Sequence, residues 1–223
     1  PVEDRQRALR AIAAYRSENA TPPEAMPSLA SEPIRAFSAV YAALILAVVH
    51  LAAGADRERQ ALFAAFDANA HLIMNGQIYR CLTALLLHAD WPHLLANMAG
   101  TLLFGTYAAA LYGWGVSWLL IIASGALGNL LTAWWYTGGH AAVGASTAVF
   151  AALGLCAAMT LWRRMALRGS GWRRWAPLAG GLALVGWLGT APRSDLLAHL
   201  LGFGVGLLCG ILYARAYGRI FPW

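Results

Sequence analysis

Residues 141–154 read AAVGASTAVFAALG, an almost wholly apolar run in which Ser146 stands two residues after Gly144. Small apolar residues of this kind are typical of a helix packed inside a lipid bilayer. A hydroxyl group at that depth is costly unless it meets a partner or serves a function. The fold and the function therefore depend on which other polar side chains reach the depth of Ser146.

The composition indicates a membrane protein. Of the 223 residues, 60% are hydrophobic and only 12% are charged, which is more apolar surface than a water-soluble domain can bury. A helix that crosses a bilayer needs about 20 mostly apolar residues. We predict an all-α, polytopic bundle of six transmembrane helices, at about residues 37–54, 91–113, 115–136, 142–162, 175–190 and 196–217.

Two polar regions divide the rest of the chain. Residues 1–34 are predicted to form a tail with a linker, and residues 35–219 one membrane domain. The long first loop of that domain, residues 55–90, contains the apolar segments ALFAAF and IYRCLTALLLH. Because these segments are too short or too interrupted to cross a bilayer, we expect them to lie in its interface.

The arginines predict the orientation in a cell membrane. All 16 basic residues are arginine, and twelve of them precede the first span, separate spans four and five, or follow span six. The side of the membrane that is richer in basic residues is cytoplasmic, so both termini are predicted to be cytoplasmic. These flanking arginines also explain the net charge of +6, so we expect no nucleic-acid partner. The absence of lysine is typical of a GC-rich bacterial genome and suggests a bacterial inner membrane.

In this topology, spans two, four and six begin at the outer surface, and each carries polar side chains there. Residues 88–100 read HADWPHLLANMAG, with His93 and Asn97 on one helical face and Asp90 as an N-cap. Ser146 and His199 each lie about four residues past the expected start of their helix, on the order of 6 Å below the outer boundary. One layer of the bundle is thus predicted to hold all four side chains.

This layer predicts acyl transfer chemistry. A serine beside a histidine base forms a nucleophile pair, and a serine at a helix start has free backbone N–H groups that bind an oxyanion. His93 and Asn97 could add side-chain donors. Span six carries Gly202, Gly206 and Gly210 at four-residue steps, which lets two helices approach as closely as a Ser–His contact requires.

These residues resemble the motifs of the rhomboid family of intramembrane serine proteases. The family pattern is H-x4-H-x3-N on the second core helix, G-x-S-G on the fourth and H-x2-G-x3-G on the sixth. The corresponding residues here are His88, His93 and Asn97, then Gly144, Ser146 and Thr147, then His199, Gly202 and Gly206. Tyr79-Arg80 is similar to the W-R element of the family's first loop. The order and spacing of the motifs make the resemblance specific.

The resemblance implies an endopeptidase that cleaves the transmembrane segments of membrane proteins near their outer end. Ser146 would be the nucleophile and His199 its base, with His93 and Asn97 at the oxyanion and His88 in support. Phe150 stands where many relatives carry a tyrosine stacked on the base. The family implies no cofactor, and its partners are transmembrane substrates in the lipid bilayer. Thr147 departs from the motif, which has glycine there, and the small residues Ala145, Ala148 and Ala152 are expected to leave room for it.

The sequence is also compatible with two alternatives. The first is a catalytically inactive rhomboid-like protein that binds transmembrane helices without cutting them, and Thr147 is its only support in the sequence. The second is a haem or metal protein that uses His88, His93 and His199. The spacing of His88 and His93 places them on different faces of a helix, and no carboxylate or cysteine joins them, so we predict no metal site.

Overall fold

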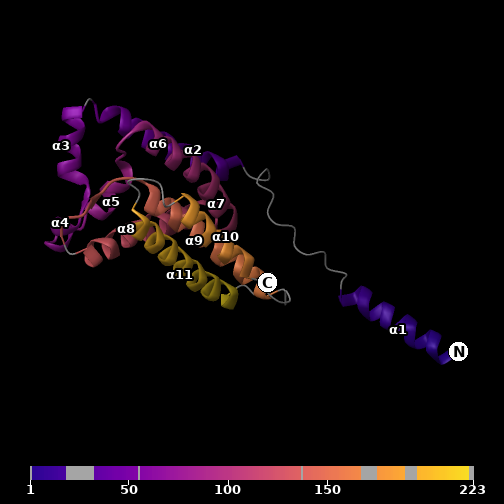
Figure 1. Cartoon of the computed structure of the whole chain (residues 1–223). Coiled ribbons are helices and arrows are strands. Elements are labelled where there is room, and N and C mark those ends of the chain that lie inside the picture. Colours follow the sequence, from indigo (N-terminus) through magenta and orange to yellow (C-terminus); the bar gives the residue numbers. More distant parts are fainter. Residues whose placement is uncertain are drawn as a thin grey trace.

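The computed structural model describes residues 2–18, 33–54, 56–136, 138–166, 175–188 and 195–220. These residues are mostly helical (Figure 1). The elements are α1 (Val2–Glu18), α2 (Pro33–Ala52), α3 (Asp56–Phe66), β1 (Ala68–Asn69), α4 (Ala70–Met74), α5 (Arg80–Thr83), η1 (Ala84–Leu86), α6 (Trp91–Gly100), η2 (Thr101–Gly105), α7 (Thr106–Tyr112), α8 (Trp114–Tyr136), β2 (Ala141–Ala142), α9 (Ser146–Ala166), α10 (Ala176–Leu188) and α11 (Leu196–Ile220).

Four of the described helical segments are long and apolar enough to cross a bilayer. They are the continuous helix α6–η2–α7 (Trp91–Tyr112), α8, α9 and α11. Two further apolar helices are shorter, Phe37–Ala52 within α2 and Ala176–Gly186 within α10. The prediction of a helical, multi-pass membrane protein is therefore confirmed, whereas a count of six spans goes beyond these four.

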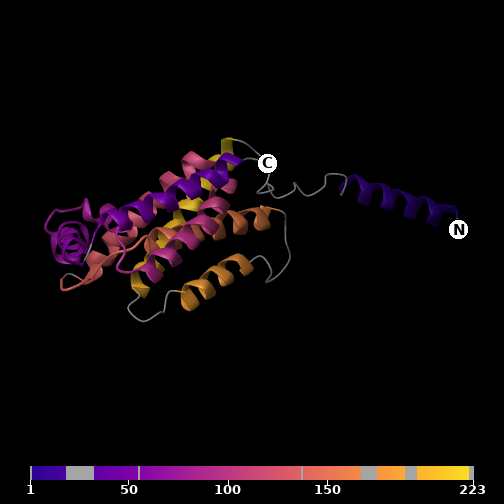
Figure 2. The same ribbon diagram turned by 90° about the horizontal axis from the view of Figure 1, so that it is seen from above.

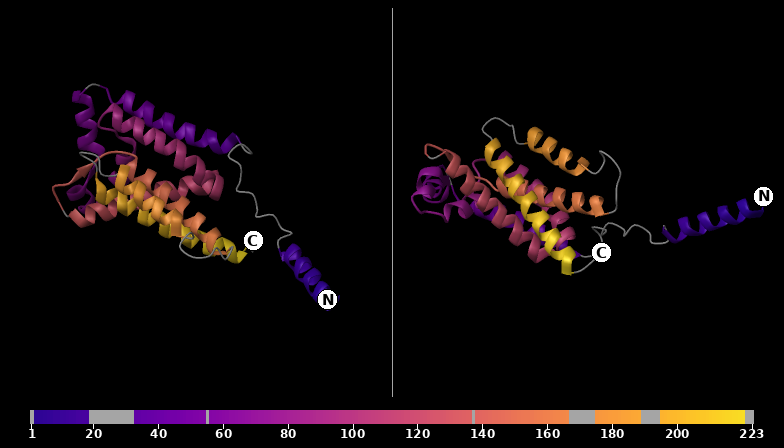
Figure 3. Two further views of the ribbon diagram at one scale, coloured as in Figure 1. Left: turned by 45° about the vertical axis from the view of Figure 1, so that its right-hand side comes forward. Right: turned by 90° about the horizontal axis from the view of Figure 1, so that it is seen from below.

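Helix α9 lies at the centre of the bundle, and every residue from 151 to 159 is buried. Its closest neighbour is α11, which runs beside it in both views of Figure 3. At Gly202 and Gly206 an added Cβ would collide with the backbone carbonyls of Thr147 and Ala151. The glycines of α11 therefore allow direct contact between the two backbones, as the sequence predicts for this pair of helices.

The helix that begins at Trp91 is capped as the sequence predicts and changes its winding midway. Asp90 accepts a hydrogen bond of 2.8 Å from the backbone N–H of His93. Residues Thr101–Gly105 form a π-helical turn, η2, between α6 and α7. Such a turn inserts one extra residue into an α-helix.

The first loop folds into short helices at one end of the bundle, the left-hand end in Figure 1. Arg80 is buried there and pairs with Asp67 at 2.9 Å, and its guanidinium also donates to the carbonyls of Ala64 and Asp67. Burial raises the pKa of Asp67 against the opposing charge of Arg80. Asn129 of α8 donates to the carbonyl of Cys81 at 2.9 Å and so attaches this loop to a membrane-spanning helix.

A short pair of strands sets where α9 begins. Ala141 and Ala142 form β2, which pairs antiparallel with β1 of the first loop. The predicted fourth span, 142–162, therefore began too early, because the helix begins at Ser146. Ser146 is the first residue of its helix rather than one turn inside it.

Candidate active site

Ser146 and His199 meet across the contact between α9 and α11. Ser146 Oγ lies 2.9 Å from Nε2 of His199, which is within hydrogen-bond reach. Ser146 begins α9, and His199 lies in the first turn of α11, where its side chain is only 5% exposed. The two side chains come from segments more than fifty residues apart, and the close approach at Gly202 holds these segments together. This arrangement allows the hydroxyl proton to pass to the imidazole.

Gly144 lets two side chains of α6 approach the start of α9. Its φ of +136° is a conformation that side-chain-bearing residues rarely adopt. A Cβ at this position would lie 2.6 Å from the imidazole of His93 and 3.5 Å from Nδ2 of Asn97. His93 and Asn97 therefore face the segment that leads into Ser146.

Asn97 brings a side-chain donor that meets no acceptor in the part of the chain that the structure describes. Its side chain is 4% exposed, and its Nδ2 has no hydrogen-bond partner within the described residues. A buried amide N–H without a partner is costly and needs an explanation. A negatively charged oxygen in the adjacent space would accept from it, as expected of an oxyanion hole.

His88 supports the loop before Ser146. Its Nε2 lies 3.4 Å from the backbone N–H of Ala145, at the long end of hydrogen-bond range, and its ring stands edge-on to that of His93. Burial lowers the pKa of His88 to about 4, with a smaller contribution from His93. The imidazole is therefore neutral near pH 7, as an acceptor for a backbone N–H has to be.

Phe150 covers the imidazole of His199. The two ring centroids lie 4.4 Å apart with an angle of 34° between the ring planes. Phe150 is one turn after Ser146 on α9 and is itself buried. The ring thus restricts the orientation of His199 without a hydroxyl group.

Thr147 is accommodated by two glycines of other helices. The threonine is 3% exposed, and its Cγ2 lies 2.7 Å from where a Cβ of Gly128 on α8 would stand and 3.0 Å from that of Gly202 on α11. The expectation that Ala145, Ala148 and Ala152 would leave the room was wrong. Thr147 projects from α9 toward α8 and α11, so the residues that leave room for it lie on those two helices.

One contact between side chains near this site was not predicted. His140, to which the sequence assigns no role, has its Nε2 2.6 Å from Oδ2 of Asp195. The only sequence signal was an aspartate at the N-cap distance before α11. In the part of the chain that the structure describes, no group of three or more potential metal ligands gathers, so the metal alternative gains no support from it.

Comparison with known proteins places this arrangement in a family. A model described as the rhomboid domain matches residues 75–216, which is more than half of the chain and includes every motif discussed above. This chain belongs to the rhomboid family. Membership in this family gives no support to the haem or metal alternative, whereas an inactive rhomboid-like protein would match the same family model.

Several relatives of this rhomboid carry the name protease. It is 31% identical over 164 residues to rhomboid-like protease 1 of Toxoplasma gondii, which covers 71% of this chain and 56% of that protein. It is 29% identical over 147 residues to the putative rhomboid protease YdcA of Bacillus subtilis, covering 66% and 73%. RHOMBOID-like protein 7 of Arabidopsis thaliana is 32% identical over 146 residues, covering 63% and 44%. The chain thus spans about half the length of the first and third of these relatives.

Proposed function

We propose that this rhomboid is an intramembrane serine endopeptidase that cleaves transmembrane segments of membrane proteins near their outer end. The observation that carries the proposal is the 2.9 Å separation of Ser146 Oγ and His199 Nε2. The protease names of its relatives agree with this reaction. No cofactor enters the reaction, because the serine–histidine pair and its donors supply the chemistry.

The reaction starts with Ser146. Its oxygen attacks the carbonyl carbon of the scissile peptide bond while its proton passes to Nε2 of His199. The carbonyl oxygen becomes an oxyanion, which accepts hydrogen bonds from Asn97, from His93 and from the backbone N–H of Ser146. His199 then donates its proton to the leaving amine, and the peptide bond breaks to leave an ester on Ser146. Water, deprotonated by His199, hydrolyses that ester and restores the hydroxyl group.

The topology belongs to the same proposal. Residues 35–219 form a membrane domain in which α2 and α10 also cross the bilayer, and residues 1–34 form a cytoplasmic tail. Twelve arginines on one side and four on the other support cytoplasmic termini and a site that opens to the outer side. A cytoplasmic reporter fused to the C-terminus should be active there, and activity of an exported reporter would contradict this orientation.

Labelling with a fluorophosphonate probe tests the nucleophile without knowledge of the substrate. We expect the wild type to be labelled and Ser146→Ala to be unlabelled and folded, because the change removes one oxygen atom. Ser124→Ala is the control, since Ser124 is a serine of another long apolar helix, α8, and lies buried there. Labelling of Ser146→Ala at the wild-type rate would refute the assignment.

The oxyanion donors have a separate test. Asn97→Ala keeps the nucleophile but removes one donor, so we expect labelling to persist and to slow by about 10²–10³-fold. Labelling of Asn97→Ala at the wild-type rate would remove Asn97 from the oxyanion hole.

A further inference from the structure

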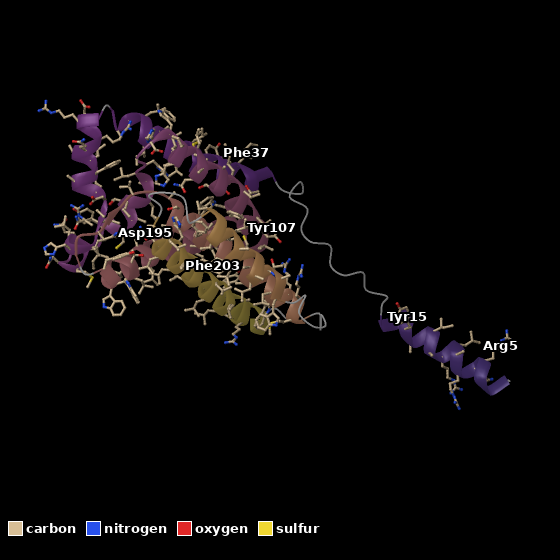
Figure 4. All side chains as sticks on the ribbon, viewed as in Figure 1. Arg5, Tyr15, Phe37, Tyr107, Asp195 and Phe203 are labelled. Atoms are coloured by element: carbon tan, nitrogen blue, oxygen red, sulfur yellow. The ribbon has the colours of Figure 1, made fainter. Side chains whose placement is uncertain are left out.

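His140 and Asp195 form a second connection between the segments that carry Ser146 and His199, in addition to the helix contact at Gly202. The 2.6 Å contact between their side chains is shorter than an ordinary neutral hydrogen bond, as expected for a charge-assisted one. The two side chains are 24% and 14% exposed, so the contact is partly shielded from water. Figure 4 labels Asp195 at the end of the bundle that carries the first loop.

Asp195 holds the end of α11 that carries His199. Its Oδ1 accepts from the backbone N–H of Ala198 at 3.0 Å, and its carbonyl accepts from the backbone N–H of His199 at 3.1 Å. Its Oδ2 is left for His140. Burial raises the pKa of Asp195, but the hydrogen bonds from His140 and Ala198 and the charge of His140 outweigh burial and lower it. The carboxylate is therefore ionised near pH 7.

His140 is fixed on the other side, in the segment that leads to Ser146. Its carbonyl accepts from the backbone N–H of Ala70 at 2.8 Å, and its ring stacks on Tyr136 with centroids 4.2 Å apart. The next residue, Ala141, starts the strand β2 that pairs with the first loop. His140 is thus attached to α8, to the first loop and to the chain that enters the active site.

We propose that His140 and Asp195 are positioning residues that set the separation of Ser146 and His199 from the aqueous end of the bundle. The inference rests on the proposed function, because the separation matters only if Ser146 reacts. Gly202 fixes the spacing of α9 and α11 below His199, and the His140–Asp195 bridge fixes it above. The glycine contacts all lie below His199, so without the bridge the end of α11 above His199 would be free to shift relative to α9.

Neither residue touches the reacting atoms, so a substitution should slow the chemical step and leave binding of the probe unchanged. A misplacement of reacting groups by about 1 Å can cost a factor of about 10² in rate. The inactivation rate constant of the fluorophosphonate should therefore fall, while the concentration for half-maximal inactivation should stay constant.

Four variants distinguish the loss of the His140–Asp195 bridge from the loss of the other contacts that these two residues make. His140→Phe keeps the ring on Tyr136 and removes the donor, and His140→Gln keeps a donor for Asp195. Asp195→Ser keeps an N-cap for α11 but is too short to reach His140. The fourth is the double variant His140→Phe/Asp195→Ser. We expect each bridge-breaking single variant to lower the inactivation rate constant by about tenfold or more. His140→Gln should stay within about threefold of wild type, and the double variant should be no slower than the slower single variant.

The outcomes distinguish a failure of the proposed role of the bridge from a failure of the proposed function. Wild-type inactivation constants in His140→Phe and Asp195→Ser, with Ser146→Ala unlabelled, would overturn the bridge alone. Additive losses in the double variant would also overturn it, because they would mean that the two residues act separately. An unlabelled wild type would overturn the proposed function and this inference with it. If Asp195→Ser does not fold, His140→Phe decides the question, since the backbone bond of His140 to Ala70 does not depend on its side chain.

Discussion

Helix α9 packs against α11 and α10 in different ways. Toward α11 the contact is between backbones, since glycines on both helices, Gly154 and Gly206, leave no room for a Cβ. Toward α10, which lies at the edge of the bundle in Figure 2, the contact is between side chains, with Val185 of α10 packed against Phe150 of α9 and Phe203 of α11. Backbone atoms cannot move aside, whereas a phenylalanine ring can. The α9–α11 contact therefore fixes the distance between these two helices, whereas the α9–α10 contact only fills the space between the helices.

The largest effect is expected from a side chain placed in the α9–α11 contact. Gly206→Val puts a branched Cβ against the carbonyl of Ala151 and should push the helices apart, which separates Ser146 from His199. We expect fluorophosphonate labelling to fall by at least about a hundredfold and the melting temperature to drop. Gly204→Ala is the control, since apart from its chain neighbours and the backbone of its own helix no described atom lies within 4 Å of a Cβ there. Equal labelling of Gly206→Val and Gly204→Ala would contradict the claim that the α9–α11 contact fixes the separation of Ser146 and His199.

An intermediate effect is expected where α8 joins the same contact. Gly128→Ala would bring a Cβ to 2.7 Å from the methyl carbon of Thr147 and displace the start of α9, slowing labelling by about tenfold. Thr147→Ser removes that methyl group, so adding it to Gly128→Ala should restore most of the rate. Thr147→Gly alone should change the rate by less than about tenfold. If Gly128→Ala is slow and Thr147→Ser does not rescue it, the clash lies elsewhere.

The smallest effect is expected on the side of α10. A Cβ at Gly181 would lie 2.7 Å and 2.9 Å from the outermost atoms of the Phe203 ring, which can tilt away. Gly181→Ala should therefore label within about twofold of wild type. The companion variant Gly180→Ala, which points into open space, calibrates the effect of alanine on the helix itself. A loss at Gly181 that approaches the loss at Gly206 would show that α10 also sets the geometry of the site.

The sequence predicted those parts of the molecule that depend on spacing along one helix. The pair His93 and Asn97 share a face because they are four residues apart, and the glycines of α11 repeat at the step that brings two helices together. The start of α9 was misjudged because Ala141 and Ala142 are as apolar as a helix, and only their pairing with β1 makes them a strand.

Contacts between distant segments were not predictable in this way. The room for Thr147 comes from Gly128 and Gly202, which lie on two other helices. The pairing of His140 with Asp195 depends on how the loop before α9 meets the start of α11. A periodic pattern describes which face a residue occupies, but it does not specify which residue of another helix lies opposite.

The π-helical turn η2 allows one long helix to serve two independent tasks. Each residue of an α-helix advances the direction of its side chains by about 100°, so one inserted residue shifts the phase of everything that follows. Before the turn, Asn97 points to the candidate active site. After it, Tyr112 points into the core, where its hydroxyl donates to the carbonyl of Leu155 at 2.7 Å. Without the inserted residue, a helix oriented so that Asn97 faces the candidate active site would not direct Tyr112 into the core. The turn therefore allows the orientation of the two halves of the helix to be set independently.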